Sequence, residues 1–306
     1  KSHIFAHWLT KYSSFGGFYP NPSGELTLVA SILKMNLMLK LKNYMKFQFT
    51  LLILILNFSL YAQDIKTCNK RLKETFEKIE FYSSQKDEYR NAYDSIDKYN
   101  GIIKKSLLKY SCSIPETLTY DFKDLTKIGL KISESQDGFF KIYCWDSETG
   151  GTMRSYRNVF QFKNGNKLFS QKLTSDIDQY GESSFSYEII DEVISENKTF
   201  YIVKCIFIGS SAVSSHKIKI FSIENSKLNE NAKLIKTKTG IRNELSYDID
   251  FSSNVNQESN SVDSEYAWIL YDKKSKTIIL PLISENGKLT KRKIKYAFKG
   301  KYFEKI

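Results

Sequence analysis

The sequence has few histidines: three in 306 residues, of which only His216 lies after residue 63. Zinc centres built on paired histidines therefore have no ligands to draw on in most of the chain. Four serines lie near His216, namely Ser210, Ser211, Ser214 and Ser215, but no G-x-S-x-G motif accompanies them. We predict no catalytic triad, no metal site and no cofactor.

The sequence also lacks a C-x-x-C motif, which excludes the usual thioredoxin-like redox site and zinc knuckle. Its four cysteines are Cys68, Cys112, Cys144 and Cys205, and all of them follow residue 63. An even number of cysteines in an exported chain suggests disulfide bonds, with three possible connectivities. Buried cysteines without disulfide bonds are the alternative.

One apolar run, residues 47–60, is shorter than the roughly 20 residues that a membrane-spanning helix needs. Lys46 precedes it, and Tyr61, Ala62 and Gln63 close it. A basic start, an apolar middle and a small residue near the exit are typical of a secretory signal peptide, which we place at residues 45–63. A signal anchor or a buried core helix would give a similar run. In both membrane-related interpretations residues 64–306 lie outside the cytoplasm, in the periplasm or the medium.

Residues 1–44 show neither helical nor strand periodicity, and we interpret them as an upstream extension outside the mature protein, with Met45 as the start. The alternative is a cytoplasmic extension of a signal anchor. Residues 64–306 contain 40 basic and 33 acidic residues. The only short basic run is Lys291-Arg292-Lys293, so we predict no nucleic-acid partner, and membrane contact only through an uncleaved signal segment.

Residues 64–126 are predicted to be helical, because apolar residues recur at spacings of three, four and seven between residues 66 and 111. Two breaks are possible. A turn near residues 85–92 would bring Cys68 and Cys112 level, so that a bridge could form. A turn at Gly101 would place Cys68 about 48 Å up the first helix from the turn, and no bridge could form.

From residue 127 to residue 306 we expect an antiparallel all-β domain, which makes the fold class α+β. Short segments rich in Ile, Phe and Tyr alternate with turn signals such as Asn164-Gly165 and Asn286-Gly287. Spacings of roughly 8–14 residues are typical of a sandwich or a barrel. A propeller-like stack is the alternative, although no repeat of fixed length is visible.

One place combines an aromatic residue, a carboxylate and a glycine-rich loop: Trp145, Asp146, Gly150 and Gly151. Such a group suits a sugar or another small polar ligand, so we predict ligand binding there. The alternative is a core tryptophan followed by an aspartate that caps a turn. A hydrolase would need two carboxylates about 5–10 Å apart, and the candidates are Asp146, Glu148, Asp248 and Asp250.

The block DGFFKIYCWDSETGGTMRSYRNVFQFK (residues 137–163) resembles uncharacterised exported proteins of Bacteroidota. The segment FSLYAQ before residue 64 is similar to secretion signals of that group, and weaker similarity continues to the C-terminal KYFEKI. The resemblance covers about the last two-thirds of the chain. It implies an exported all-β domain and brings no catalytic residues with it.

These observations predict a periplasmic, envelope or secreted protein whose β domain binds a ligand or partner without catalysis. The expected partner is a protein or a glycan of the cell envelope. A hydrolase that acts on glycan or another envelope polymer through strand-end carboxylates is the alternative.

Overall fold

The computed structural model describes residues 22–174, 184–252, 268–285 and 288–306. The chain divides into two compact units, residues 1–60 and 61–306. The backbone of α2 (Pro22–Ser84) begins in the first unit and ends in the second. Within the described part of the chain, no helix holds a stretch long and apolar enough to cross a membrane. The turn signal predicted at Asn286-Gly287 lies outside the described residues.

Two helical segments form one layer of the second unit: the last turns of α2 and α3 (Ala92–Ser113). The short η1 (Pro115–Leu118) and α4 (Lys123–Thr126) follow them. The buried residues of α2 recur every three or four positions, at Ile65, Cys68, Leu72, Phe76 and Ile79, which places them on one face. The break lies at residues 85–91, and α3 continues through Gly101.

The first sheet is an antiparallel meander of four strands in the order β1-β2-β3-β4. Its strands are β1 (Lys131–Glu134), β2 (Phe140–Asp146), β3 (Tyr156–Asn164) and β4 (Lys167–Gln171). The predicted turn at Asn164-Gly165 connects β3 to β4, and Gly165 has a φ of +59°, a conformation that glycine adopts without strain.

The central sheet has the order β11-β7-β6-β5. Its members are β5 (Ser186–Ser195), β6 (Lys198–Ile208), β7 (Val213–Glu224) and β11 (Glu244–Asp250), with β8 (Lys227–Asn229) paired to β7. The outer sheet has six strands in the order β10-β9-β15-β14-β13-β12. These are β9 (Ile235–Thr237), β10 (Gly240–Arg242), β12 (Leu270–Asp272), β13 (Thr277–Ile283), β14 (Leu289–Phe298) and β15 (Phe303–Lys305).

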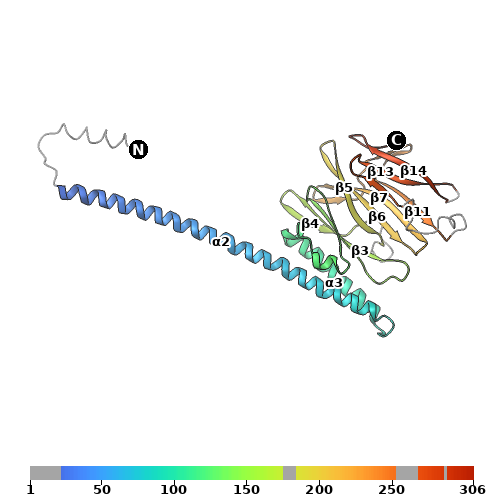
Figure 1. The fold of residues 1–306 in the computed structure, drawn as a ribbon, viewed down its shortest axis with the longest axis horizontal. Helices are drawn as coiled ribbons and strands as arrows, with labels where there is room; N and C mark the ends of the chain where they lie inside the picture. The colour runs from blue at the N-terminus through green and yellow to red at the C-terminus, as the bar shows by residue number, and fades with distance from the viewer. Residues whose placement is uncertain (1–21, 175–183, 253–267, 286–287) are drawn as a thin grey trace. The chain divides into compact units, whose positions relative to one another are not determined.

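Among the described strands, all pairs are antiparallel except β15 with β9, which is parallel. Within the described residues none of the sheets closes into a barrel. The predicted α+β fold, a helical segment followed by an antiparallel β domain, is thus confirmed, and the arrangement is a stack of sheets (Figure 1).

Three hydrophobic clusters define the order of the layers. The first joins the helices to one face of the first sheet through residues such as Tyr143 and Val159. The second joins the other face of that sheet to the central sheet, where Phe140 and Phe160 meet Phe221. The third joins the central sheet to the outer sheet. The layers therefore run from the helices through the first and central sheets to the outer sheet.

None of the four cysteines forms a disulfide bond in the structure. Cys68 is buried in the helix–sheet cluster, and Cys144 and Cys205 are buried on their strands. Cys112 is exposed, and its Sγ lies 2.9 Å from Ser170 Oγ on β4. The turn at residues 85–91 is the one that favoured a bridge between Cys68 and Cys112. The structure does not contain that bridge, because Cys68 is in the core and Cys112 contacts the first sheet.

Candidate functional site

Trp145 lies in the core rather than at the surface. Its side chain is only 1% exposed, Nε1 donates a hydrogen bond to Asn100 Oδ1 over 2.8 Å, and the ring packs edge-on against Phe76. Asn100, itself buried in α3, also donates to the carbonyl oxygen of Ser147 over 2.7 Å. The indole therefore joins the helices to the first sheet, and it is not available for stacking on a ligand.

Asp146 caps the turn that follows β2. Its Oδ1 accepts the backbone N–H of Glu148 at 3.0 Å, and Oδ2 accepts a hydrogen bond from Arg154 at 3.1 Å. Glu148 has a φ of +58°, a left-handed conformation that costs energy for a residue with a side chain. This is the arrangement that we gave as the alternative to ligand binding: a core tryptophan and a capping aspartate.

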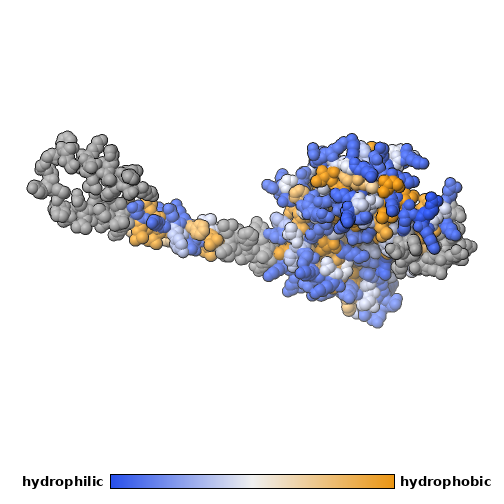
Figure 2. All heavy atoms as spheres, turned by 45° about the horizontal axis from the view of Figure 1, so that its top comes forward, coloured by the Kyte–Doolittle hydropathy of each residue, from blue (hydrophilic) through white to orange (hydrophobic). Residues whose placement is uncertain are grey.

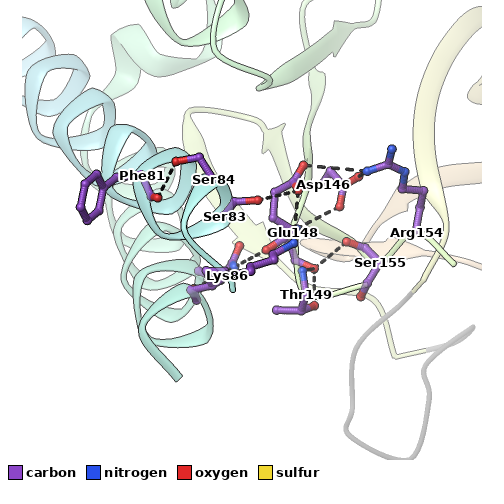
Figure 3. A network of polar contacts seen from close by, with 12 residues as sticks. Phe81, Ser83, Ser84, Lys86, Asp146, Glu148, Thr149, Arg154 and Ser155 are labelled. Atoms are coloured by element: carbon purple, nitrogen blue, oxygen red, sulfur yellow. Dashed lines mark hydrogen bonds and ion pairs between the residues drawn. The ribbon is translucent and has the colours of Figure 1, made fainter. Parts of the chain in front are cut away.

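Glu148 connects this turn to the end of the helical layer (Figure 3). Its Oε2 accepts a hydrogen bond from Ser83 over 3.0 Å and lies 3.7 Å from Lys86 Nζ, while Oε1 lies 4.0 Å from Arg154. Asp146 and Glu148 are therefore both engaged by cations. The network holds the helices and the turn together.

The two predicted glycines differ in their surroundings. A Cβ placed on Gly150 would lie 1.9 Å from the carbonyl oxygen of Met153, whereas a Cβ on Gly151 would meet nothing within 4 Å. Gly150 is thus required by the close approach of the backbone across the turn. It also lines a polar hollow of about 460 Å³ with Lys104, Arg154 and Arg157, in which Arg157 pairs with Asp97 over 3.6 Å.

The other carboxylates proposed for hydrolysis, Asp248 and Asp250, lie on β11 of the central sheet, away from the turn after β2. Asp248 accepts a hydrogen bond from Ser215 over 2.5 Å, and Asp250 accepts one from the N–H of Ser252 over 2.8 Å. The structure does not bring the four candidate carboxylates together in one pocket.

Ser214 and His216 are in contact, with Oγ and Nε2 2.9 Å apart. Both side chains are 1% exposed, and the imidazole stacks on Tyr247 with ring centroids 5.2 Å apart. Burial lowers the pKa of His216 to about 4, because the charged imidazolium loses its hydration. The pair is buried and part of the packing between β7 and β11.

A larger hollow, of about 580 Å³, lies where β1 of the first sheet meets β5 and β6 of the central sheet. We call it the Trp268 hollow. Its aromatic and aliphatic lining consists of Leu130, Ile132, Tyr156, Tyr187, Ile206, Ile208 and Trp268. Its polar lining consists of Thr126, Lys131, Ser133, Ser186, Glu188 and Lys204. A concave, largely apolar site with a few convergent polar groups is typical of small-molecule binding.

Three features of the Trp268 hollow bear on its chemistry. Glu188 Oε2 and Lys204 Nζ are 2.7 Å apart on neighbouring strands, so they present an acceptor and a donor side by side. Lys131 Nζ lies 5.6 Å from the ring centroid of Tyr156. The indole of Trp268 is partly exposed and packs edge-on against His216.

The Trp268 hollow is not among the sites predicted from the sequence. The predicted site is centred on Trp145, which the structure places in the core with its indole bonded to Asn100. The pairing of Glu188 with Lys204 depends on the register of β5 with β6. The aromatic character of the segment around Trp268, next to a long polar stretch, was the one signal present in the sequence.

Within the described ranges, no three His, Cys, Asp or Glu side chains come together as metal ligands would. In the comparisons with known proteins, no family model matches the sequence, and no curated protein or solved structure is significantly similar to it.

Proposed function

We propose that this chain is an exported binding protein without catalytic activity, and that its β domain holds a sugar-type ligand in the Trp268 hollow. Export is supported by the basic, apolar and small-residue pattern of residues 45–63. Binding is supported by one observation above all: a partly exposed indole and a Glu–Lys pair line the same hollow.

The arrangement suits a sugar because a sugar has two kinds of surface. Its C–H face packs on an aromatic ring, and its hydroxyl groups both donate and accept hydrogen bonds. Trp268 and Tyr156 offer the aromatic surface, while Glu188 accepts and Lys204 donates. A neutral polyol leaves the Glu–Lys pair intact and adds hydrogen bonds to it.

Binding without hydrolysis is favoured because glycoside hydrolysis needs two carboxylates flanking the bond. Among the described residues that line the Trp268 hollow, Glu188 is the only carboxylate, and Lys204 engages it.

The test uses the full chain and the N-acetylglucosamine trimer chitotriose, followed by a panel of neutral hexose trimers. We expect isothermal titration calorimetry to detect binding, and Trp268→Ala to weaken it about tenfold. Glu188→Gln combined with Lys204→Met removes the polar pair and is expected to weaken binding as well. Phe139→Ala is the matched control, because Phe139 is an exposed aromatic residue that does not line the hollow.

Two results would contradict the proposal. If no trimer of the panel binds, or if Trp268→Ala binds as tightly as Phe139→Ala, the hollow is not a sugar site. If the wild-type protein releases new reducing ends from a trimer, the chain is a hydrolase.

A further inference from the structure

The last part of the chain carries most of its excess positive charge. Residues 268–306 contain eleven Lys and Arg against three Asp and Glu, a net charge of +8, whereas the whole chain has +12. This part forms β12, β13, β14 and β15, which are four of the six strands of the outer sheet. The positive charge is therefore concentrated on one layer of the fold.

Strand alternation places several of these charges on the face that points away from the core. Ile278 and Leu280 of β13 pack against the central sheet, so Ile279 lies on the opposite face. Its partner across β14 is Lys295, and Pro281 pairs with Lys293. The register puts Lys293 and Lys295 on the outward face.

The outward face continues on the neighbouring strands. On β9, Ile235 is buried in the core and Lys236 lies on the other side, where it pairs with Glu304 over 3.0 Å. Lys291 and Arg292, at the irregular start of the β13–β14 pairing, are both exposed. Basic side chains thus follow β14 and recur on β9.

Aliphatic side chains lie between these charges. Leu270 is 40% exposed and pairs with Ile279, and Ile241 is 38% exposed and pairs with Lys236. The surface view in Figure 2 shows hydrophobic and hydrophilic residues side by side on the β domain. A face that mixes exposed aliphatic groups with lysines suits an interface that is itself part apolar and part anionic.

A hollow of about 480 Å³ at the edge of this face adds a second observation. Lys236, Lys238 and Lys305 line it, together with Tyr296, Glu304, Thr237 and Thr239. Three ammonium groups against one carboxylate, with two hydroxyl donors nearby, suit an anion the size of a phosphate group.

We propose that the outward face of the outer sheet lies on a membrane surface that contains anionic phospholipid headgroups. The ammonium groups of Lys236, Lys293 and Lys295 contact the phosphates, and Ile279 and Leu270 reach the interface between headgroups and acyl chains. Each lysine near such a surface strengthens binding about fivefold. A nucleic acid is a poorer fit, because the described outward face has aliphatic side chains where bases would need aromatic ones.

The test measures hydrogen–deuterium exchange of the full chain on vesicles of phosphatidylcholine, with and without phosphatidylglycerol. We expect slower amide exchange in β13 and β14 only on the vesicles that contain phosphatidylglycerol. Exchange is measured separately for each segment because total vesicle binding would not be informative. The apolar run at residues 47–60 would itself hold the chain on both kinds of vesicle.

The decisive variant is Lys291→Gln/Lys293→Gln/Lys295→Gln, and its matched control is Lys105→Gln/Lys167→Gln/Lys227→Gln. The control removes the same charge from exposed positions on α3, β4 and β8. We expect the first variant to need at least about tenfold more anionic lipid for the same protection of β14, and the control to behave as the wild type.

Equal behaviour of the two variants, or no protection of β14, would overturn the proposal. Inorganic polyphosphate is the competing ligand in the same assay. If it protects β14 as strongly as vesicles at equal phosphate concentration, the face binds soluble polyanions and the membrane assignment is wrong. Unchanged chitotriose binding by both lysine variants keeps this result separate from the Trp268 hollow.

Discussion

The central and outer sheets are both predominantly antiparallel, yet their surroundings differ. The central sheet has a hydrophobic cluster on each face, whereas the two described clusters that contain residues of the outer sheet both join it to the central sheet. Buried positions follow one another in β6 and β7, for example at Tyr201, Ile202 and Val203. On β14 the exposed residues Lys291, Arg292 and Lys295 lie among partly buried ones. A sheet packed on both faces contributes more buried apolar surface to stability than a sheet packed on one face, and the membrane contact proposed above uses the face of the outer sheet that points away from the core.

Several polar groups of the central sheet are buried and have hydrogen-bond partners. His216 and Ser214, for example, are buried and hydrogen-bonded to each other. Even the edge of that sheet is covered, since Ile189 N–H donates to Ser133 Oγ of β1 over 2.9 Å. Such cover protects an edge strand from pairing with other chains.

Matched Ile→Ala substitutions give the largest expected difference between the two sheets. Ile202 is fully buried in the central sheet, so Ile202→Ala is expected to lower the free energy of unfolding by about 3 kcal/mol through lost burial and a cavity. Ile279 lies on the outward face of the outer sheet, and Ile279→Ala is expected to cost less than about 1 kcal/mol. Urea unfolding of both variants measures the difference, and equal losses would show that the outward face of the outer sheet is covered in solution.

Lowering the pH is expected to lower the free energy of unfolding through His216 of the central sheet. Its pKa is about 4 in the folded state, against about 6.5 in the unfolded chain. As pH falls from 6.5 to 4 the unfolded state takes up the proton and the folded state does not, so stability declines over that window. The expected loss is on the order of 2–3 kcal/mol by pH 4.5.

Other groups of the protein also titrate in this window, so the contribution of His216 is measured as the difference between the wild type and a variant without the imidazole. Unfolding free energies of the wild type and of His216→Gln are compared at pH 7 and pH 4.5. The variant is expected to lose less stability on acidification. The same loss in both proteins would mean that the imidazole is hydrated in the folded state.

Much of this fold is predictable from the sequence, and the reason is strand length. The long strands, such as β5, β6 and β13, contain enough alternating or continuous apolar positions to be recognised. The strands β1, β8, β10 and β15 have three or four residues each, too few to show a period in the sequence. Such short strands form by pairing with other strands, and a local sequence pattern does not indicate that pairing.

The candidate sites were less predictable, because they depend on pairings distant in sequence. Trp145 is a core residue owing to Asn100, 45 positions earlier. The lysines looked evenly spread along the chain, with only one short run at residues 291–293. Strand register brings Lys236, Lys293 and Lys295 to one face, and that register depends on the parallel pairing of β15 with β9.

The smallest expected effect has the opposite sign to the others. Lys295 lies on the outward face near Lys293, two positions away on the same strand, and like charges so placed repel each other. Lys295→Gln is therefore expected to raise the free energy of unfolding by a few tenths of a kcal/mol at low ionic strength, and this gain should vanish near 1 M salt because the charges are then screened. Thermal unfolding at two salt concentrations measures it, with Lys167→Gln on β4 as the control. A loss of stability would mean that the side chain of Lys295 makes a stabilising contact within the protein. A salt-dependent gain would instead mean that the lysines of the outward face act against folding, which is the behaviour expected of charges that serve binding.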